Sequence, residues 1–268
     1  MKEKITLTKE KETLLATLYA RATESKSSNP IIKDEMAEHA IDNIDYDFRK
    51  LKVDVLSIAM RAKQFDIWTN EFLSQNPKSI VIQLGCGLDS RIYRINPSSD
   101  VYWYDIDFPE VIDLRKKIYP TRSGYEMIGS SLENLDWISS LPNNIPVWII
   151  AEGVTMYLSH EIMEPLLKRF TEYFQNGAIA FDAISKSALG LANKNRSIKA
   201  TGATFGGWYV DNPDDLKKVA PKLNLVSESV THRLPGYSKL PIGTKILVRI
   251  FDYFPSLRRM SRILYLKF

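Results

Sequence analysis

Cysteine, histidine and long apolar runs are all scarce in this sequence of 268 residues. The single cysteine, Cys86, excludes an internal disulfide framework and any metal site built from several cysteines. The three histidines, His39, His160 and His232, are scattered, so we expect no zinc or iron centre. No apolar segment is long enough to span a bilayer, and the N-terminal residues resemble neither a signal peptide nor an anchor. These absences favour a cytoplasmic protein without membrane insertion.

An excess of charge of one sign is also lacking. Lys+Arg outnumber Asp+Glu by 36 to 32, and this net charge of +4 gives no reason to expect a nucleic-acid partner. The C-terminal segment is basic, and two roles are open for it: a charged binding surface, or an amphipathic element docked on the core. We expect docking with a solvated charged face, because apolar residues lie between the charges. The residues concerned are Lys245, Arg249, Arg258, Arg259, Arg262 and Lys267, with Ile246, Leu247, Val248 and Leu257 between them.

The first third of the chain has the apolar spacing of helices. This spacing occurs in residues 9–24, 34–48 and 54–74, and Asp54 is a candidate N-cap for the last of these segments. No strand pattern precedes residue 79. We therefore expect residues 1–77 to form a helical cap region that packs on the core.

Strand and helix patterns alternate in the remainder of the chain. Apolar strands that alternate with helices pair in parallel and are covered on both faces. We expect a Rossmann-like α/β core over residues 78–268, with a polar and irregular insert at about 185–223 on the substrate side. The expected strands are 79–84, 101–106, 146–151, 178–183, about 224–230 and 262–268, and the expected helices are 108–118, 160–175, about 213–220 and 242–254.

A glycine loop, GCGLDS at 85–90, directly follows the first of these strands. Glycine permits a sharp turn and the close approach of a ligand, and the start of the next helix offers free N–H groups. Dinucleotide enzymes carry a third glycine where Ser90 stands and hold a pyrophosphate there. The loop therefore fits a ligand with no phosphate at this point and disfavours an NAD-linked oxidoreductase. The structural alternative is a tight turn capped by Asp89 or Ser90.

Carboxylates follow the second and fourth strands. Asp105 and Asp107 lie roughly 20 residues after the glycine loop, where an acidic side chain can accept both ribose hydroxyls. Their alternative role is a solvated loop or an N-cap. Glu152 follows VWIIA and can bind an ammonium group or act as a base, because ligands of α/β sheets lie beyond the carboxyl ends of strands. Tyr157 fits either a core position or a pocket wall.

Taken together, these segments resemble the leucine carboxyl methyltransferase superfamily, and within it the polyketide O-methyltransferase branch typified by the tetracenomycin enzymes. GCGLDSR and AEGVTMYL at their separation are far more specific than a Gly-x-Gly loop alone. The likeness occurs in family order over more than half of the chain. The matching segments are 21–48, 58–66, 81–94, 103–117, 130–142, 149–161 and 179–185, with weaker likeness over 199–216.

The resemblance implies a class I methyltransferase fold that binds S-adenosylmethionine. Its sheet has seven strands, the last of them antiparallel, and helices precede the first strand. It also implies roles for individual residues. Arg61 matches an arginine that holds the methionine carboxylate, Glu152 a glutamate that meets the amino group, and Asp107 the ribose acid, with Asp105 as the fallback. Gly85, Cys86 and Gly87 match the loop under the cofactor, and Tyr157 and Lys199 are candidates for substrate contacts.

Two positions depart from the family pattern. Many relatives carry Asp-Leu after the third strand, where the aspartate meets the adenine amino group, whereas this chain has Ser131-Leu132. Serine keeps a hydrogen-bond acceptor there but no charge. Gln83 stands where the wider class often has an acid.

The resemblance therefore implies an O-methyltransferase that uses S-adenosylmethionine, releases S-adenosylhomocysteine and needs no metal. The expected acceptor is a carboxylate or acidic hydroxyl of a small molecule, such as a polyketide-like secondary metabolite. A carboxylate needs no base whereas a phenol or alcohol does, and no His or Asp stands out as that base. His160 fits a helix start at the surface. The alternatives are a non-catalytic binding or regulatory module and a methyltransferase of protein C-terminal carboxyl groups.

Overall fold

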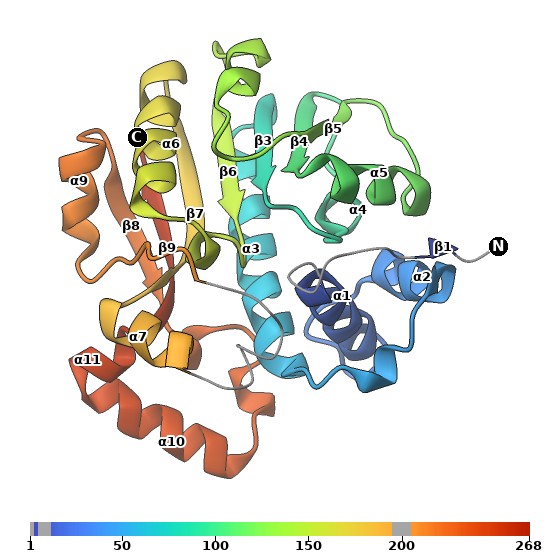
Figure 1. The fold of residues 1–268 in the computed structure, drawn as a ribbon, viewed down its shortest axis with the longest axis vertical. Coiled ribbons are helices and arrows are strands. Elements are labelled where there is room, and N and C mark those ends of the chain that lie inside the picture. The colour runs from blue at the N-terminus through green and yellow to red at the C-terminus, as the bar shows by residue number, and fades with distance from the viewer. Residues whose placement is uncertain (1–2, 5–11, 195–204) are drawn as a thin grey trace.

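A seven-stranded sheet forms the centre of the computed structural model, which describes residues 3–4, 12–194 and 205–268 (Figure 1). The strand order is β5-β4-β3-β6-β7-β9-β8. Strand β9 runs opposite to the other six strands of this sheet, as the family resemblance implies. The strands are β3 (Ser79–Leu84), β4 (Val101–Asp107), β5 (Tyr125–Gly129), β6 (Val147–Ala151), β7 (Gly177–Ile184), β8 (Asn224–Ser229) and β9 (Ser261–Lys267).

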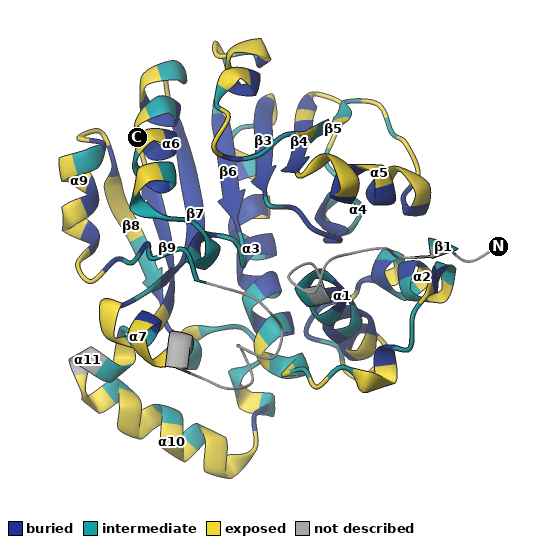
Figure 2. Ribbon diagram, in the orientation of Figure 1, coloured by how far each residue is buried: buried dark blue, intermediate teal, exposed yellow. Residues whose placement is uncertain are grey.

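The central strands are buried along their length, which explains why their sequences are largely apolar. Figure 2 shows β3, β6 and β7 in the dark blue of buried residues. Strand β5 has a different character because it lies at the edge, pairs only with β4 and leaves its side chains partly exposed. Its sequence, YEMIG, therefore carries no apolar run, and the pattern of apolar runs alone does not predict it.

Helices cover both faces of the sheet and add a cap at one end (Figure 1). Asp54 caps α3 by accepting a hydrogen bond from the Ser57 amide at 3.1 Å, as predicted. The predicted helix at 34–48 is shorter, because α2 gives way to the two-residue strand β2 (Ile44–Asp45), which pairs with β1 (Glu3–Lys4). The helices are α1 (Glu12–Ser25), α2 (Glu35–Asn43), α3 (Val55–Gln75), α4 (Arg91–Ile95), α5 (Pro109–Ile118), α6 (His160–Tyr173), α7 (Lys186–Lys194), α9 (Leu216–Val219), α10 (Ile242–Tyr253) and α11 (Pro255–Arg258).

The apolar core explains how the helices are held. The face of the sheet that carries Trp103 and Trp148 packs against Phe65, Trp68 and Phe72 of α3. The opposite face packs against the apolar side of α6 and against α9. Helices α1 and α2 form a separate apolar cluster with α5, and α1 also packs against α3. The N-terminal helices are thereby fixed beside the carboxyl ends of β3 and β4.

The segment 185–223, predicted to be irregular, begins with the helix α7. The single helix predicted at about 213–220 is instead a 3-10 turn (Pro213–Asp215) followed by α9. Lys199, the candidate substrate contact, lies outside the described residues.

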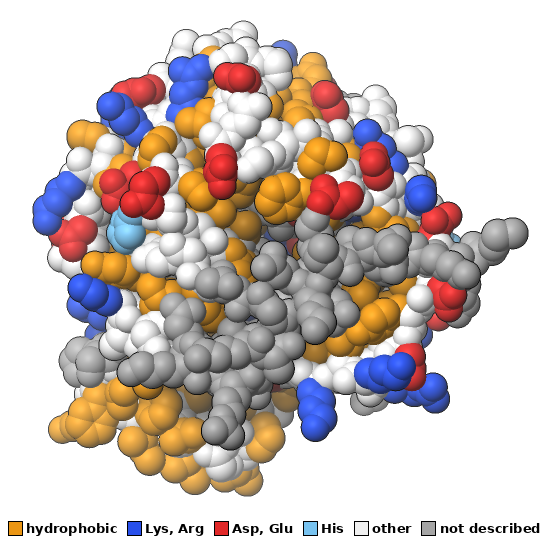
Figure 3. Space-filling view, viewed as in Figure 1, with side chains coloured by type: hydrophobic (Ala, Val, Ile, Leu, Met, Phe, Trp, Pro, Cys, Tyr) orange, Lys and Arg blue, Asp and Glu red, His pale blue; other side chains and the backbone are white. Residues whose placement is uncertain are grey.

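The C-terminal segment does not dock as predicted. None of the residues of α10 is buried, and Ile246 and Leu247 are 55% and 50% exposed. Figure 3 shows hydrophobic side chains gathered at this end of the molecule. The prediction was wrong because amphipathic spacing identifies residues that share a helix face but not what covers that face. Arg262, predicted to be solvated, is buried and donates to Glu228 and to backbone oxygens.

None of the helices among the described residues is both long and apolar enough to cross a bilayer.

Candidate functional site

The glycine loop after β3 makes the sharp turn that its sequence predicts. Gly85 and Gly87 have φ values of 56° and 50°, in the left-handed region that favours glycine. A Cβ on Gly85 would lie 2.5 Å from Val154, and one on Gly87 would lie 2.7 Å from Leu14. Both the conformation and the available space therefore require glycine, and the loop exposes backbone where a side chain would otherwise stand.

The structural alternative for this loop, a capped turn, does not account for its polar residues. Ser90 occupies the N-cap position of α4, but its side chain makes no cap hydrogen bond and instead bonds Asp34. Asp89 accepts from the Gln83 side chain at 2.8 Å and pairs with arginines. These side chains are directed into the interior and do not serve the helix start.

The two aspartates of β4 have different surroundings. Asp107 accepts from the Gly87 and Phe108 amides at 2.7 and 2.8 Å, and it lines a cavity beside the loop. Burial raises the pKa of Asp107, against the lowering by its two amide donors. Asp105 is bound by the Arg115 guanidinium and by Trp103 Nε1 and does not line this cavity. The geometry thus favours Asp107 over the fallback Asp105 as a ribose contact.

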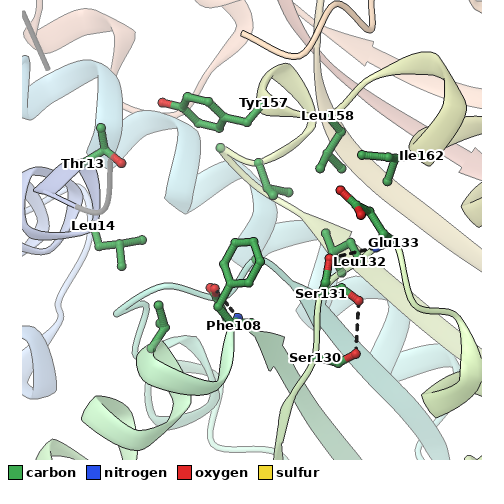
Figure 4. Close-up of a pocket in the computed structure, with 15 residues that line it drawn as sticks. Thr13, Leu14, Phe108, Ser130, Ser131, Leu132, Glu133, Tyr157, Leu158 and Ile162 are labelled. Carbon is green, nitrogen blue, oxygen red and sulfur yellow. Dashed lines mark hydrogen bonds between the residues drawn. The ribbon is translucent and has the colours of Figure 1, made fainter. Parts of the chain in front are cut away.

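The cavity beside Asp107 has a volume of about 320 Å³ (Figure 4). Phe108, Leu132, Leu158 and Ile162 give it apolar walls, and Ser130 and Ser131 border it on one side. Ser131 Oγ accepts from the Glu133 amide at 3.2 Å and keeps its own hydroxyl proton for another partner. An apolar space with a few polar atoms at its border suits a purine ring.

A second cavity, of about 210 Å³, continues from the first. Both are lined by Gly85, Gly153 and Tyr157, so the two form one groove. Arg61, Glu152 and Cys86 line only the second part. Burial raises the pKa of the Cys86 thiol, which therefore contributes no charge. The predicted residues thus fall into two groups, an apolar end with Asp107, Ser131 and Leu132 and a charged end with Arg61 and Glu152.

Arg61 and Glu152 are brought together from distant parts of the chain. Arg61 Nε lies 3.0 Å from Glu152 Oε1, although 91 positions separate the two residues. Gly153 leaves room for this contact, because a Cβ there would lie 3.1 Å from the Arg61 guanidinium. Burial lowers the pKa of Arg61, but the neighbouring Asp182 and Glu152 carboxylates raise it by more, so the group stays charged.

A network of buried charges supports this pair, and the sequence analysis did not predict it. Arg91 bonds the second oxygen of Glu152 and also reaches Asp66 Oδ1 at 2.8 Å. Behind it, Arg94 Nη1 contacts Asp34 and Asp89 at 2.7 and 2.8 Å. Burial raises the pKa of Asp89, but Arg91, Arg94 and Arg21 lower it well below its usual value. The sequence does show a set of acids and arginines, in KDE (33–35), KQFD (63–66) and GLDSRIYR (87–94). Spacing alone does not show which of these side chains contact one another.

Asp182 is the second residue that sequence reasoning missed. It lies in β7, is 5% exposed, and its Oδ2 accepts from the Gly153 amide and lies 3.5 Å from Arg61 Nη1. Burial raises the pKa of Asp182 to about 6. The signal was an acid inside an otherwise apolar buried strand, AIAFDAI.

The geometry agrees with a family relationship that covers most of the chain. Residues 14–171 match the family model described as leucine carboxyl methyltransferase. The chain belongs to this family. It is therefore an S-adenosylmethionine-dependent methyltransferase.

Two relatives show where in the family the chain lies. It is 41% identical over 226 residues to the tetracenomycin polyketide synthesis O-methyltransferase TcmP of Streptomyces glaucescens, covering 83% of each chain. It is 33% identical to the S-adenosyl-L-methionine-dependent methyltransferase dpfgK of Gibberella zeae, covering 94% of this chain and 93% of the relative. A solved structure, the plantazolicin methyltransferase BpumL in complex with S-adenosylhomocysteine, has the same fold, with a TM-score of 0.51, 12% identity and 97% coverage of both chains.

Proposed function

We propose that this enzyme transfers a methyl group from S-adenosylmethionine to an oxygen atom of a small molecule. The observation that carries the cofactor assignment is the contact of Arg61 with Glu152 beside the glycine loop. The oxygen acceptor and its small size are supported by the relative TcmP, whose name describes an O-methyltransferase of polyketide synthesis.

The residues present fit the cofactor along the whole groove. Gly85 and Gly87 line the groove with backbone, and a Cβ on either would collide with the neighbouring Val154 or Leu14 side chain. At the apolar end, Asp107 would hold the ribose hydroxyls, and Ser131 and Leu132 would border the adenine. At the charged end, Arg61 would hold the methionine carboxylate and Glu152 the amino group, a pair of charge-assisted contacts. When bound, the cofactor supplies an electrophilic methyl group on a sulfonium.

The charge of the site favours a cationic ligand. Four arginines (Arg21, Arg61, Arg91 and Arg94) and five carboxylates (Asp34, Asp66, Asp89, Glu152 and Asp182) form one connected cluster of ion pairs. An excess of one carboxylate suits S-adenosylmethionine, which carries one net positive charge. Because Arg91 also holds Glu152, the glutamate stays in place when Arg61 turns to a ligand.

Tyr157 lines both parts of the groove and stacks on Phe205 with 5.5 Å between ring centroids. We assign it to the wall of the acceptor side. Lys199 remains a prediction, as does the division into a cap over 1–77 and a core over 78–268. Among the described residues, no cluster of His, Cys, Asp or Glu is arranged to hold a metal ion.

The proposal is tested with cofactor carrying a ¹³C-labelled methyl group and a panel of phenols, alcohols and carboxylic acids. We expect S-adenosylhomocysteine and an O-methyl product in equal amounts, identified by its NMR signal. Methylation at carbon, or no O-methyl product from any member of the panel, would contradict the proposal.

A further inference from the structure

Helix α10 turns its apolar side to solvent, and Figure 2 shows most of the helix in the yellow of exposed residues. A surface helix ordinarily turns its apolar side to the core. The least exposed positions of α10 are Lys245, Val248 and Asp252, whose spacing of three and four residues places them on one face. The remainder of the helix carries a set of large apolar side chains that are 39–84% exposed, and we call this set the α10 apolar face. Its members are Ile242, Ile246, Leu247, Ile250, Phe251 and Tyr253.

Polar contacts hold the inner side of α10 against the rest of the protein. Lys245 Nζ donates to the Ser238 carbonyl at 3.2 Å, and the Tyr237 hydroxyl donates to the Lys245 carbonyl at 3.1 Å. His232 Nδ1 lies 2.5 Å from Asp252 Oδ2. The apolar face can turn inward only if these contacts break, so its exposure is a property of the fold.

The α10 apolar face is too extensive to be a set of scattered surface residues. Phe254, which follows the helix directly, is 49% exposed and extends it. Contiguous apolar patches on a protein surface mark sites that bind a protein or a membrane. The sequence NRSIKATGAT at 195–204 contains one large apolar side chain, Ile198, and therefore offers little to cover such a face.

The charge of the surrounding segment distinguishes between the possible partners. Residues 231–260 contain six Lys or Arg and one acid, whereas the other 238 residues contain 30 Lys or Arg and 31 acids. The acid is Asp252, which contacts His232, while Arg249 and Arg258 are exposed. A second copy of this chain would bring two positive segments together, at a cost in electrostatic free energy. The segment therefore suits a partner that is negatively charged and also accepts apolar side chains.

We propose that α10 binds the surface of a membrane that contains anionic phospholipids. Helices with an apolar face and nearby Lys or Arg lie in the membrane interface, with the apolar side chains at the boundary between headgroups and acyl chains. Arg249 and Arg258 would contact lipid phosphates, and Phe251, Tyr253 and Phe254 are aromatic residues of the kind that the interface favours. The enzyme would lie on the membrane without crossing it. This inference does not depend on the proposed function, because no residue of α10 lines the cofactor groove.

Co-sedimentation of the full-length enzyme with lipid vesicles tests the proposal. One set of vesicles consists of phosphatidylcholine with about 30 mol% phosphatidylglycerol, and the other of phosphatidylcholine alone. We expect the affinity for the anionic vesicles to be higher by about tenfold or more, because each Lys or Arg near an anionic surface favours binding. We also expect added salt to weaken this binding, because it screens the charges.

Variants of exposed residues show whether α10 is the surface that binds. We expect the double variant Ile250→Ser, Phe254→Ser to lower the affinity for anionic vesicles by about tenfold or more, because it removes two exposed apolar side chains. Its matched control is Leu225→Ser, Val226→Ser, which removes two similarly exposed apolar side chains from β8 and is expected to bind as the wild type does.

The contribution of charge is tested in the same way. Arg249→Glu is expected to weaken binding to the anionic vesicles, whereas Lys116→Glu, the same change in net charge at an exposed position of α5, is expected to have little effect. All four variants should bind S-adenosylhomocysteine as the wild type does, because none of the altered residues lines the cofactor groove.

Several results would overturn the proposal. They are no binding to the anionic vesicles, equal affinity for both kinds of vesicle, and binding that the α10 variants leave unchanged. Sedimentation velocity without vesicles tests the rival occupant, a second copy of the chain. A dimer that the Ile250→Ser, Phe254→Ser variant converts to a monomer, together with no binding to vesicles, would assign the α10 apolar face to self-association.

Discussion

The two ends of the cofactor groove are built in different ways. The apolar end consists of a glycine loop, one aspartate held by backbone amides, and apolar walls from the segments that follow β4, β5 and β6. The charged end consists of side chains from α1, α3, α4, β6 and β7 that meet only in the folded protein. Short segments at the ends of strands therefore specify most of the apolar end, whereas the charged end depends on tertiary packing.

The difference has energetic consequences. Substitutions at the apolar end remove ligand contacts and leave few buried charges behind. At the charged end each side chain neutralises others in the interior, so its removal leaves an uncompensated buried charge. We therefore expect the charged end to couple ligand affinity to protein stability, and the apolar end to affect affinity alone.

The largest effect is expected for Arg91→Ala. Arg91 is fully buried and contacts Asp66, Asp89 and Glu152. Its removal leaves these carboxylates short of a partner, and we expect a loss of about 3–5 kcal/mol in the free energy of unfolding. Urea unfolding measures this, with the exposed Arg49→Ala as the control that leaves the midpoint unchanged. A loss below about 1 kcal/mol would show that the network is not stabilising.

Glu152→Gln tests the ligand contact of the same network while keeping the volume of the side chain. We expect binding of S-adenosylhomocysteine to weaken by about 1.5–3 kcal/mol, the contribution of a hydrogen bond to a charged group. Calorimetry measures this, and circular dichroism checks that the variant is folded. Unchanged affinity in folded protein would leave Glu152 with a purely structural role.

The Arg61→Lys variant tests whether Arg61 contacts the amino-acid part of the ligand and not its adenosine part. Lysine keeps the charge but lacks the planar two-pronged donor, so affinity for S-adenosylhomocysteine is expected to fall by about tenfold or more. Adenosine lacks the amino-acid part and is expected to bind the variant and the wild type equally. Equal losses for both ligands would place Arg61 in the fold or in the nucleoside end.

The smallest effect is expected at the apolar end, for Ser131→Asp. The new carboxylate would accept from the adenine amino group, and we expect tighter S-adenosylhomocysteine binding by about 0.5–1.5 kcal/mol, with stability unchanged. Ser130→Asp, one position earlier in the same cavity wall, is the comparison. If both variants strengthen binding equally, the gain comes from the added negative charge in the cavity wall and not from a contact with the adenine amino group.

Features that depend on local sequence could be predicted, whereas features that depend on tertiary contacts could not. The glycine loop, the Asp54 cap and the central strands follow from local patterns, because backbone conformation and burial on both faces leave a direct trace in the sequence. Strand β5 leaves no such trace because it is a half-exposed edge. Asp182 and Arg91 could not be assigned from spacing, because their partners lie far away along the chain. The docking of α10 was predicted wrongly, since its pattern says nothing of a covering surface.

The most direct test of the account is a crystal structure of the enzyme with S-adenosylhomocysteine. In the structure described above, Arg61 Nε and Glu152 Oε1 are 3.0 Å apart and bind each other. We predict that in the complex the Arg61 guanidinium bonds the ligand carboxylate and Glu152 bonds the ligand ammonium, while Arg91 remains on Glu152. A complex in which the Arg61–Glu152 contact is intact and the amino-acid part of the ligand lies elsewhere would contradict the account.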